Sequence, residues 1–196
     1  MYLKFVLKGL VVGSAVSLSL LVSQLSYAQE PSSFRSWNYP DRYIRHRLSL
    51  GYIDKIGAND KLGRSDATFR LVPGLAGKCI SFESVNYPGS FLRHQDYRLK
   101  LAKQANDQLF KNDATFCVVS GLFRSDGRSF ESVNFPNHYI RHSNFELWLA
   151  KSDGSELFKK DATFIVSPPL TVHPPAAGPI DPGTNTIPAP RELPIL

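Results

Sequence analysis

The sequence predicts an all-β protein with the β-trefoil fold, built from three internal repeats of about 48 residues. Three observations support this prediction. A pattern of fourteen residues occurs three times, the tetrapeptide Asp-Ala-Thr-Phe follows each copy, and short runs of alternating apolar and polar residues lie between turn residues. Three repeats are too few for a propeller, and twelve short strands with threefold repetition suit a closed barrel capped by three hairpins.

Residues 1–28 are expected to form a cleaved secretory signal peptide. Lys4 and Lys8 precede an apolar run that ends near residue 22, and Ser26 and Ala28 place small side chains where signal peptidase cleaves. The apolar run is near the lower length limit for a membrane span, so an uncleaved anchor is the alternative. We therefore expect a secreted or periplasmic protein that makes no membrane contact after cleavage.

The trefoil domain is expected at residues 31–170, with repeats at residues 32–76, 77–124 and 125–170. The second and third copies of the pattern are SFESVNYPGSFLRH and SFESVNFPNHYIRH, and the first copy, SFRSWNYPDRYIRH, is less regular. Equivalent residues of the pattern are 48 positions apart. The first repeat has one additional residue between its two markers.

Within the second repeat we expect strands at residues 80–85, 90–94, 97–102 and 114–119, and no helix. A turn at residues 86–89 and a polar loop at residues 104–107 separate them. Aromatic residues that recur in register are expected to form the core: Phe34, Phe82 and Phe130, with Phe69, Phe116 and Phe164.

The sequence contains two cysteines, Cys79 and Cys117. An even pair in an exported protein suggests a disulfide, and a thiol catalyst is the alternative. Cys79 directly precedes the first expected strand of the second repeat and Cys117 lies in the last one. These two strands are neighbours in a trefoil lobe, so the fold and the disulfide support each other.

The C-terminal segment and the charge distribution restrict the kinds of partner that we expect. Residues 171–196 are rich in proline and are expected to form a disordered or extended tail. The net charge is +6 for the whole chain, and basic residues are dispersed through the repeats, so nucleic acid is not expected as a partner. No cofactor or metal is expected, and the protein is expected to be a monomer.

Three histidines and three aspartates recur at matched positions, each aspartate 19 or 20 residues after its histidine. A ring nitrogen and a carboxylate that meet at the surface of each lobe would suit sugar hydroxyls, which both donate and accept hydrogen bonds. The alternative is that the aspartates only satisfy backbone amides in a turn. The candidate residues are His46, Asp66, His94, Asp113, His142 and Asp161.

The second repeat, SFESVNYPGSFLRH followed by DATFC, resembles the arabinose-binding domain of α-L-arabinofuranosidase B, the family 42 carbohydrate-binding modules. The resemblance covers residues 32–167 and implies a β-trefoil, a disulfide between the two cysteines, and one pocket per lobe for arabinofuranose side chains of arabinoxylan or arabinan. It implies that each His and Asp pair hydrogen-bonds the sugar. The first repeat departs from the pattern at Arg35 and Trp37, so the resemblance supports its site least.

Three functions remain open. Glycoside hydrolysis usually requires two carboxylates that flank one bond, whereas the matched aspartates belong to separate lobes. We therefore expect binding without catalysis to an arabinose-substituted polysaccharide. α-L-Arabinofuranosidase activity, or a role in L-arabinose metabolism, is one alternative, and a trefoil that binds proteins is the other.

Overall fold

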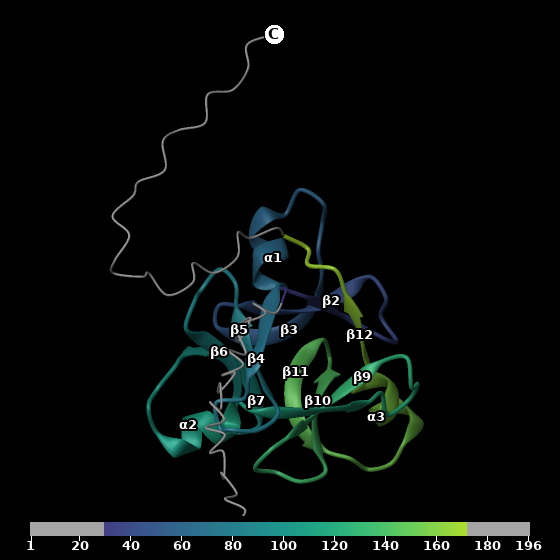
Figure 1. Ribbon diagram of the computed structural model, residues 1–196. Coiled ribbons are helices and arrows are strands. Elements are labelled where there is room, and N and C mark those ends of the chain that lie inside the picture. Colours follow the sequence, from purple (N-terminus) through teal and green to yellow (C-terminus); the bar gives the residue numbers. More distant parts are fainter. Residues whose placement is uncertain (1–29, 172–196) are drawn as a thin grey trace, which may run out of the picture.

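A computed structural model of the chain describes residues 30–171, which form three lobes around a common axis (Figure 1). The predicted signal peptide lies outside the described residues, as does the predicted tail beyond residue 171. Within residues 30–171, no helix combines the length and the apolar character needed to cross a membrane. The elements in chain order are β1 (Ser33–Ser36), β2 (Arg42–Arg47), β3 (Leu50–Lys55), α1 (Lys61–Asp66), β4 (Phe69–Pro73), β5 (Ile80–Ser84), β6 (Ser90–Gln95), β7 (Arg98–Lys103), α2 (Gln108–Asp113), β8 (Phe116–Ser120), β9 (Arg128–Ser132), β10 (His138–Ser143), β11 (Glu146–Lys151), α3 (Glu156–Asp161) and β12 (Phe164–Ser167).

Strands β1, β4, β5, β8, β9 and β12 form a barrel. Antiparallel pairs β1–β12, β4–β5 and β8–β9 make its long ladders, and single pairs join β5 to β8 and β9 to β12. A bridge between Ser32 and Phe69 closes the ring between the first and fourth strands. This closure leaves the barrel without an edge strand, and it confirms the predicted β-trefoil.

The hairpins β2–β3, β6–β7 and β10–β11 cap one end of the barrel and meet pairwise at the threefold axis. Arg98 lies at this junction, where its Nη1 donates to the carbonyl oxygens of Gly51, Leu99 and Leu147. These three carbonyls occupy equivalent positions in the three repeats. One guanidinium therefore satisfies backbone acceptors from all three lobes at once.

Three phenylalanines, one from each repeat, meet in the centre of the barrel. The ring centroids of Phe34, Phe82 and Phe130 lie 4.9 to 5.6 Å apart in edge-to-face pairs, and none of the three side chains is exposed. Phe69, Phe116 and Phe164 surround them and are equally buried. The predicted core is confirmed, and the threefold repeat places identical rings where the three lobes must meet.

The expectation of no helix was wrong, because each repeat contains one six-residue helix before its Asp-Ala-Thr-Phe marker. The side chains of Asp60, Asp107 and Ser155 cap these helices by accepting a hydrogen bond from the backbone amide three residues later. Six residues are too few to show helical periodicity in the sequence, so only the capping residue marks the start. Each helix ends on the aspartate of the marker.

Cys79 and Cys117 form the predicted disulfide, with 4.7 Å between their Cα atoms. The predicted strands of the second repeat agree with β5, β6, β7 and β8 to within about two residues at each end. The additional residue of the first repeat lies in the loop between β3 and α1.

Candidate functional site

The structure brings each recurring histidine together with the aspartate of its own repeat. The histidines lie near the ends of β2, β6 and β10, and the aspartates are the last residues of α1, α2 and α3. A ring nitrogen lies 3.6, 3.4 and 3.5 Å from a carboxylate oxygen in lobes one, two and three. All six side chains are almost fully buried, at the base of three separate cavities. The pairs are His46 with Asp66, His94 with Asp113, and His142 with Asp161.

An arginine precedes each histidine and neutralises the aspartate. Nη2 of Arg45, Arg93 and Arg141 lies 2.6 Å from the Oδ2 atom of the aspartate in its own lobe. The Nε atom of each arginine also donates to the carbonyl of the following histidine. An Arg-His doublet ends all three copies of the repeated pattern, but the sequence alone gives the arginine no role. The structure shows that it fixes the carboxylate, because a charge-assisted hydrogen bond holds one oxygen in place.

An asparagine from the next lobe completes each cluster. In lobe two, Asn134 Nδ2 donates to Asp113 Oδ1 at 2.9 Å, and Asn134 Oδ1 lies 3.1 Å from His94 Nε2. Asn86 does the same in lobe one and Asn38 in lobe three. The interpretation of these asparagines as turn residues only was therefore incomplete. Each site spans two repeats, so sequence analysis of one repeat could not show it.

The asparagine also determines which ring nitrogen carries the proton. A carboxylate only accepts hydrogen bonds, so the amide nitrogen faces the aspartate and the amide oxygen faces the histidine. His Nε2 must then donate to the asparagine, and Nδ1 is the acceptor in the neutral ring. Within residues 30–171, no hydrogen bond to Nδ1 of His46, His94 or His142 is present. His94 and His142 thus keep an acceptor available for a hydroxyl group, whereas Nδ1 of His46 lies 3.6 Å from Asp66 Oδ1.

Burial keeps the three rings neutral. It lowers the pKa of His46 and His94 below the usual value of 6.5, and the nearby aspartate only partly offsets the effect. In lobe three, burial lowers the pKa of His142 to about 4 despite the attraction of Asp161, and the neighbouring Arg141 acts in the same direction as burial. At neutral pH each cluster therefore contains a neutral imidazole, an ionised carboxylate and a guanidinium.

Aromatic side chains form a wall of each cavity. Tyr87, Phe135 and Tyr39 follow the asparagines of the Asn-x-Pro turns, and their rings pack edge-on against the histidines at 5.4, 5.2 and 5.4 Å between centroids. Tyr97 and Phe145 add a second wall in lobes two and three, where the first lobe has Ser49. Sequence reasoning missed both sets, although the repeated aromatic between Asn and Pro was a visible signal.

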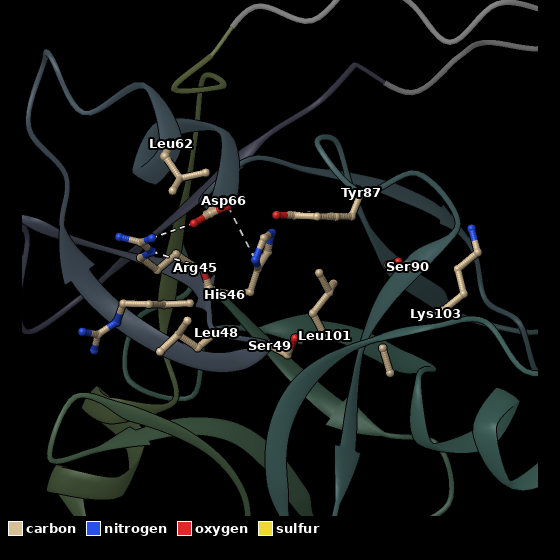
Figure 2. A pocket seen from close by; sticks show the side chains of 12 residues that line it. Arg45, His46, Leu48, Ser49, Leu62, Asp66, Tyr87, Ser90, Leu101 and Lys103 are labelled. Atoms are coloured by element: carbon tan, nitrogen blue, oxygen red, sulfur yellow. Dashed lines mark hydrogen bonds and ion pairs between the residues drawn. The ribbon is translucent and has the colours of Figure 1, made fainter.

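The exposed apolar side chains of the described residues gather around these cavities. Leu62, Leu109 and Leu157 occupy equivalent positions on the three helices, and each is more than 60% exposed. Each of these leucines lines the cavity of its lobe (Figure 2 shows the first lobe). The cavities measure about 360, 490 and 220 Å³ in lobes one, two and three.

Other residues singled out by the repeat have structural roles. Glu83 Oε1 accepts a hydrogen bond from the backbone amide of Gly89, and Glu131 does the same for Asn137, so these carboxylates hold the Asn-x-Pro turns. Arg35 replaces only this turn contact in the first repeat, and the cluster of lobe one is complete without it. Phe91 is buried and packs against Phe110, outside the cavities.

Comparison with known proteins agrees with this architecture. The model of the alpha-L-arabinofuranosidase B (ABFB) domain matches residues 22–71 and 58–166. A GH54 α-L-arabinofuranosidase mutant soaked with 4-nitrophenyl α-L-arabinofuranoside is 29% identical, with a TM-score of 0.67 over 74% of this chain and 32% of that one. An arabinofuranosidase complexed with arabinofuranosyl-α-1,2-xylobiose is 30% identical, with a TM-score of 0.66 over 72% of this chain and 31% of that one.

The chain thus spans about a third of the length of these arabinofuranosidases. A β-trefoil named BEL shares the fold alone, at 11% identity and a TM-score of 0.54 over 70% of this chain and 92% of that one. A search among curated proteins finds no significant match.

Proposed function

This chain belongs to the alpha-L-arabinofuranosidase B (ABFB) domain family, and we propose that it is an exported, non-catalytic module that binds arabinofuranose side chains of arabinoxylan or arabinan. The observation that carries the proposal is the same cluster of His, Asp, Arg and Asn at the base of a cavity in all three lobes. Each lobe therefore provides one site, including the first lobe.

The chemistry of the cluster suits a neutral sugar. In lobes two and three the Nδ1 atom of the histidine accepts a hydrogen bond from a hydroxyl group, and in all three lobes the remaining lone pairs of the aspartate do so. The exposed aromatic wall and the leucine offer apolar surface to the C–H groups of a furanose ring. In lobe two these groups are His94, Asp113, Phe135, Tyr97 and Leu109.

The number of carboxylates at the sites of lobes one and three supports binding without hydrolysis. A glycosidase requires a general acid and a second carboxylate on one bond. Among residues 30–171, Asp66 is the only carboxylate that lines the cavity of lobe one and Asp161 the only one in lobe three, whereas Asp96 and Asp107 line the cavity of lobe two beside Asp113. Asp66 and Asp161 are each already held by an arginine and an asparagine, so lobes one and three offer no second carboxylate for the other side of a glycosidic bond.

Three similar sites on one small domain suit a branched polymer. After one side chain of the polysaccharide is bound, binding of a second becomes intramolecular, which raises the overall affinity without any new contact. The predicted signal peptide and the disulfide between Cys79 and Cys117 support an extracytoplasmic location, where such polymers occur.

Isothermal titration with arabinofuranosyl-α-1,2-xylobiose tests the proposal. We expect three sites in the wild type, two in His94→Ala or Asp113→Asn, and one when His142→Ala is added. Asp126→Asn is the matched control, because Asp126 is an exposed carboxylate paired only with Arg124. Unchanged stoichiometry in the double variant would contradict the pocket assignment.

Two further assays separate the alternatives. Release of 4-nitrophenol from 4-nitrophenyl α-L-arabinofuranoside by the wild type, lost in Asp113→Asn, would show a hydrolase. No binding to any arabinofuranosyl oligosaccharide would instead favour a trefoil that binds proteins.

A further inference from the structure

The cavity of lobe one reaches strands β6 and β7 of the neighbouring repeat. It continues from His46 and Asp66 across the neighbouring repeat to Ser90, Leu101, Ala102 and Lys103. Figure 2 shows His46 and Asp66 near the middle of this pocket and Ser90 and Lys103 at its right-hand end. The cavities of lobes two and three include none of the equivalent residues of their neighbouring repeats.

A turn position and its partner in the neighbouring repeat account for the difference. In lobe two, Tyr97 stacks on His138, the residue equivalent to Ser90, at 6.1 Å between ring centroids. In lobe three, the guanidinium of Arg42 lies 3.8 Å above the ring of Phe145. Both contacts close the cavity toward the neighbouring repeat. Lobe one has Ser49 at this position, and its short side chain leaves the passage open.

The backbone at this position is the same in all three lobes. Ser49, Tyr97 and Phe145 have φ values of 62°, 62° and 63°. Their carbonyls also accept equivalent hydrogen bonds from the neighbouring repeats, at 2.8, 2.7 and 2.8 Å. A bulky residue is disfavoured in this left-handed conformation, so the aromatic rings are held at the cavities against a local preference. Lobe one differs in the side chains at this position and at its partner, where Ser49 and Ser90 replace Tyr97 with His138 and Phe145 with Arg42.

The open end of the lobe one cavity carries a positive charge that no acidic side chain neutralises. Within residues 30–171, the Nζ atom of Lys103 has no carboxylate within 4.0 Å, and it donates to the carbonyl of Pro88. The equivalent Lys55 is neutralised by Asp41 at 2.7 Å, whereas the position equivalent to Asp41 beside Lys103 is Gly89. The other positively charged side chains of this cavity are both neutralised: Arg45 is paired with Asp66, and Arg47 is paired with Asp54.

We propose that lobe one binds two linked sugars, an arabinofuranose over His46 and Asp66 and a second, carboxylate-bearing sugar against Ser49, Ser90 and Lys103. The first half of this site rests on the proposed function. The second half is specific to lobe one. Two serine hydroxyls supply hydrogen bonds to the second sugar, Leu101 supplies an apolar floor, and Lys103 pairs with the carboxylate.

The test uses a variant in which only lobe one remains active, with His94→Ala and His142→Ala. The probes are methyl α-L-arabinofuranoside, an arabinofuranosyl oligosaccharide that carries glucuronic acid next to the arabinose, and the same oligosaccharide after chemical reduction of its carboxyl group. We expect the acidic probe to bind about fivefold more tightly than its reduced form, and this advantage to disappear in 0.5 M salt.

Two substitutions in this background locate the second sugar. Lys103→Gln should abolish the difference between the acidic and reduced probes, whereas the matched control Lys151→Gln should preserve it. Ser49→Tyr should weaken both oligosaccharides about tenfold and change the affinity for the methyl glycoside less than twofold. Ser49 and Tyr97 both have a φ of 62°, so a tyrosine fits the backbone at position 49 and we expect this variant to fold.

The outcomes separate this proposal from the proposed function. If no probe binds in wild-type protein, arabinose binding itself fails. If the methyl glycoside binds but Ser49→Tyr and Lys103→Gln have no effect on the acidic probe, only the extended site fails. If the lobe one variant is unstable, the wild type can be titrated with the same probes instead. The NMR signals of the His46 ring then report binding in lobe one, and the same outcomes support or overturn the extended site.

Discussion

His142 in the third repeat and Asn38 in the first are far apart in the sequence, yet His142 Nε2 lies 2.8 Å from Asn38 Oδ1. The corresponding pairs join lobe one to lobe two and lobe two to lobe three. The three sites therefore form a closed ring in which each lobe supplies the histidine of one site and the asparagine of another. This arrangement couples the sites to the assembly of the whole trefoil.

Removal of one asparagine should weaken one site only. Asn134→Ala deprives Asp113 of a donor and His94 of its acceptor, so the ring and the carboxylate lose their fixed orientation. We expect binding in lobe two to weaken about tenfold, and lobes one and three to be unaffected. Titration with arabinofuranosyl-α-1,2-xylobiose in a background with His46→Ala and His142→Ala measures this. Asn112→Ala is the control, since Asn112 only accepts from Gln108 on the surface; equal effects of the two variants would refute the role of Asn134.

The stability of the fold should fall in mild acid. Burial lowers the pKa of His142 from 6.5 in the unfolded chain to about 4 in the folded protein. Between these pH values the unfolded chain binds more protons, so the free energy of unfolding is complete above about pH 6.5 and decreases as the pH falls toward 4. His142 alone should account for roughly 3 kcal/mol across this range. His46 and His94 shift in the same direction.

Urea unfolding at pH 7.0, 5.5 and 4.5 measures this dependence. His142→Asn should make the stability less dependent on pH, whereas His138→Asn, outside the three clusters, should not. A stability that is constant from pH 7 to 4.5 would show that the rings are accessible to protons in the folded state.

Arg98 should be important for stability and not for binding. Arg98→Met removes the donor shared by the carbonyls of Gly51, Leu99 and Leu147, and leaves them unpaired where the three hairpins meet. We expect a loss of about 2 kcal/mol in the free energy of unfolding, as for other buried acceptors left without a donor. Thermal and urea unfolding test this, with Lys100→Met on the same strand as the control. A stable Arg98→Met variant would mean that water replaces the guanidinium.

The disulfide should contribute a large part of the stability. Cys79 and Cys117 close a loop with a sequence separation of 38 residues, which corresponds to about 4 kcal/mol in the chain-entropy model. Unfolding in urea with and without a reducing agent, together with Cys79→Ser/Cys117→Ser, measures the contribution. The loop contains His94 and Asp113 of lobe two, but neither cysteine lines any of the three cavities, so the folded double variant should bind the oligosaccharide as the wild type does. A change below 1 kcal/mol would show that the reduced chain already holds these strands together.

Much of the fold followed from the sequence because the repeat imposes it. Phe34, Phe82 and Phe130 recur at a fixed spacing, and three identical rings can be buried together only around a threefold axis. The short helices could not be predicted in the same way. Their only marks are a capping residue, such as Asp107, and one buried residue, such as Phe110, which also fit a loop between strands.

The sequence by itself determined the three lobes, the disulfide partners, and the pairing of each histidine with the aspartate of its own repeat. These features lie within one repeat or follow directly from its periodicity. Only the tertiary structure decided which lobe completes each site, since the contact of His94 with Asn134 joins different repeats. It also decided that Ser49 opens one cavity while Tyr97 and Phe145 close the others. A periodic pattern specifies equivalent positions, but the contacts between neighbouring lobes exist only after the barrel has closed.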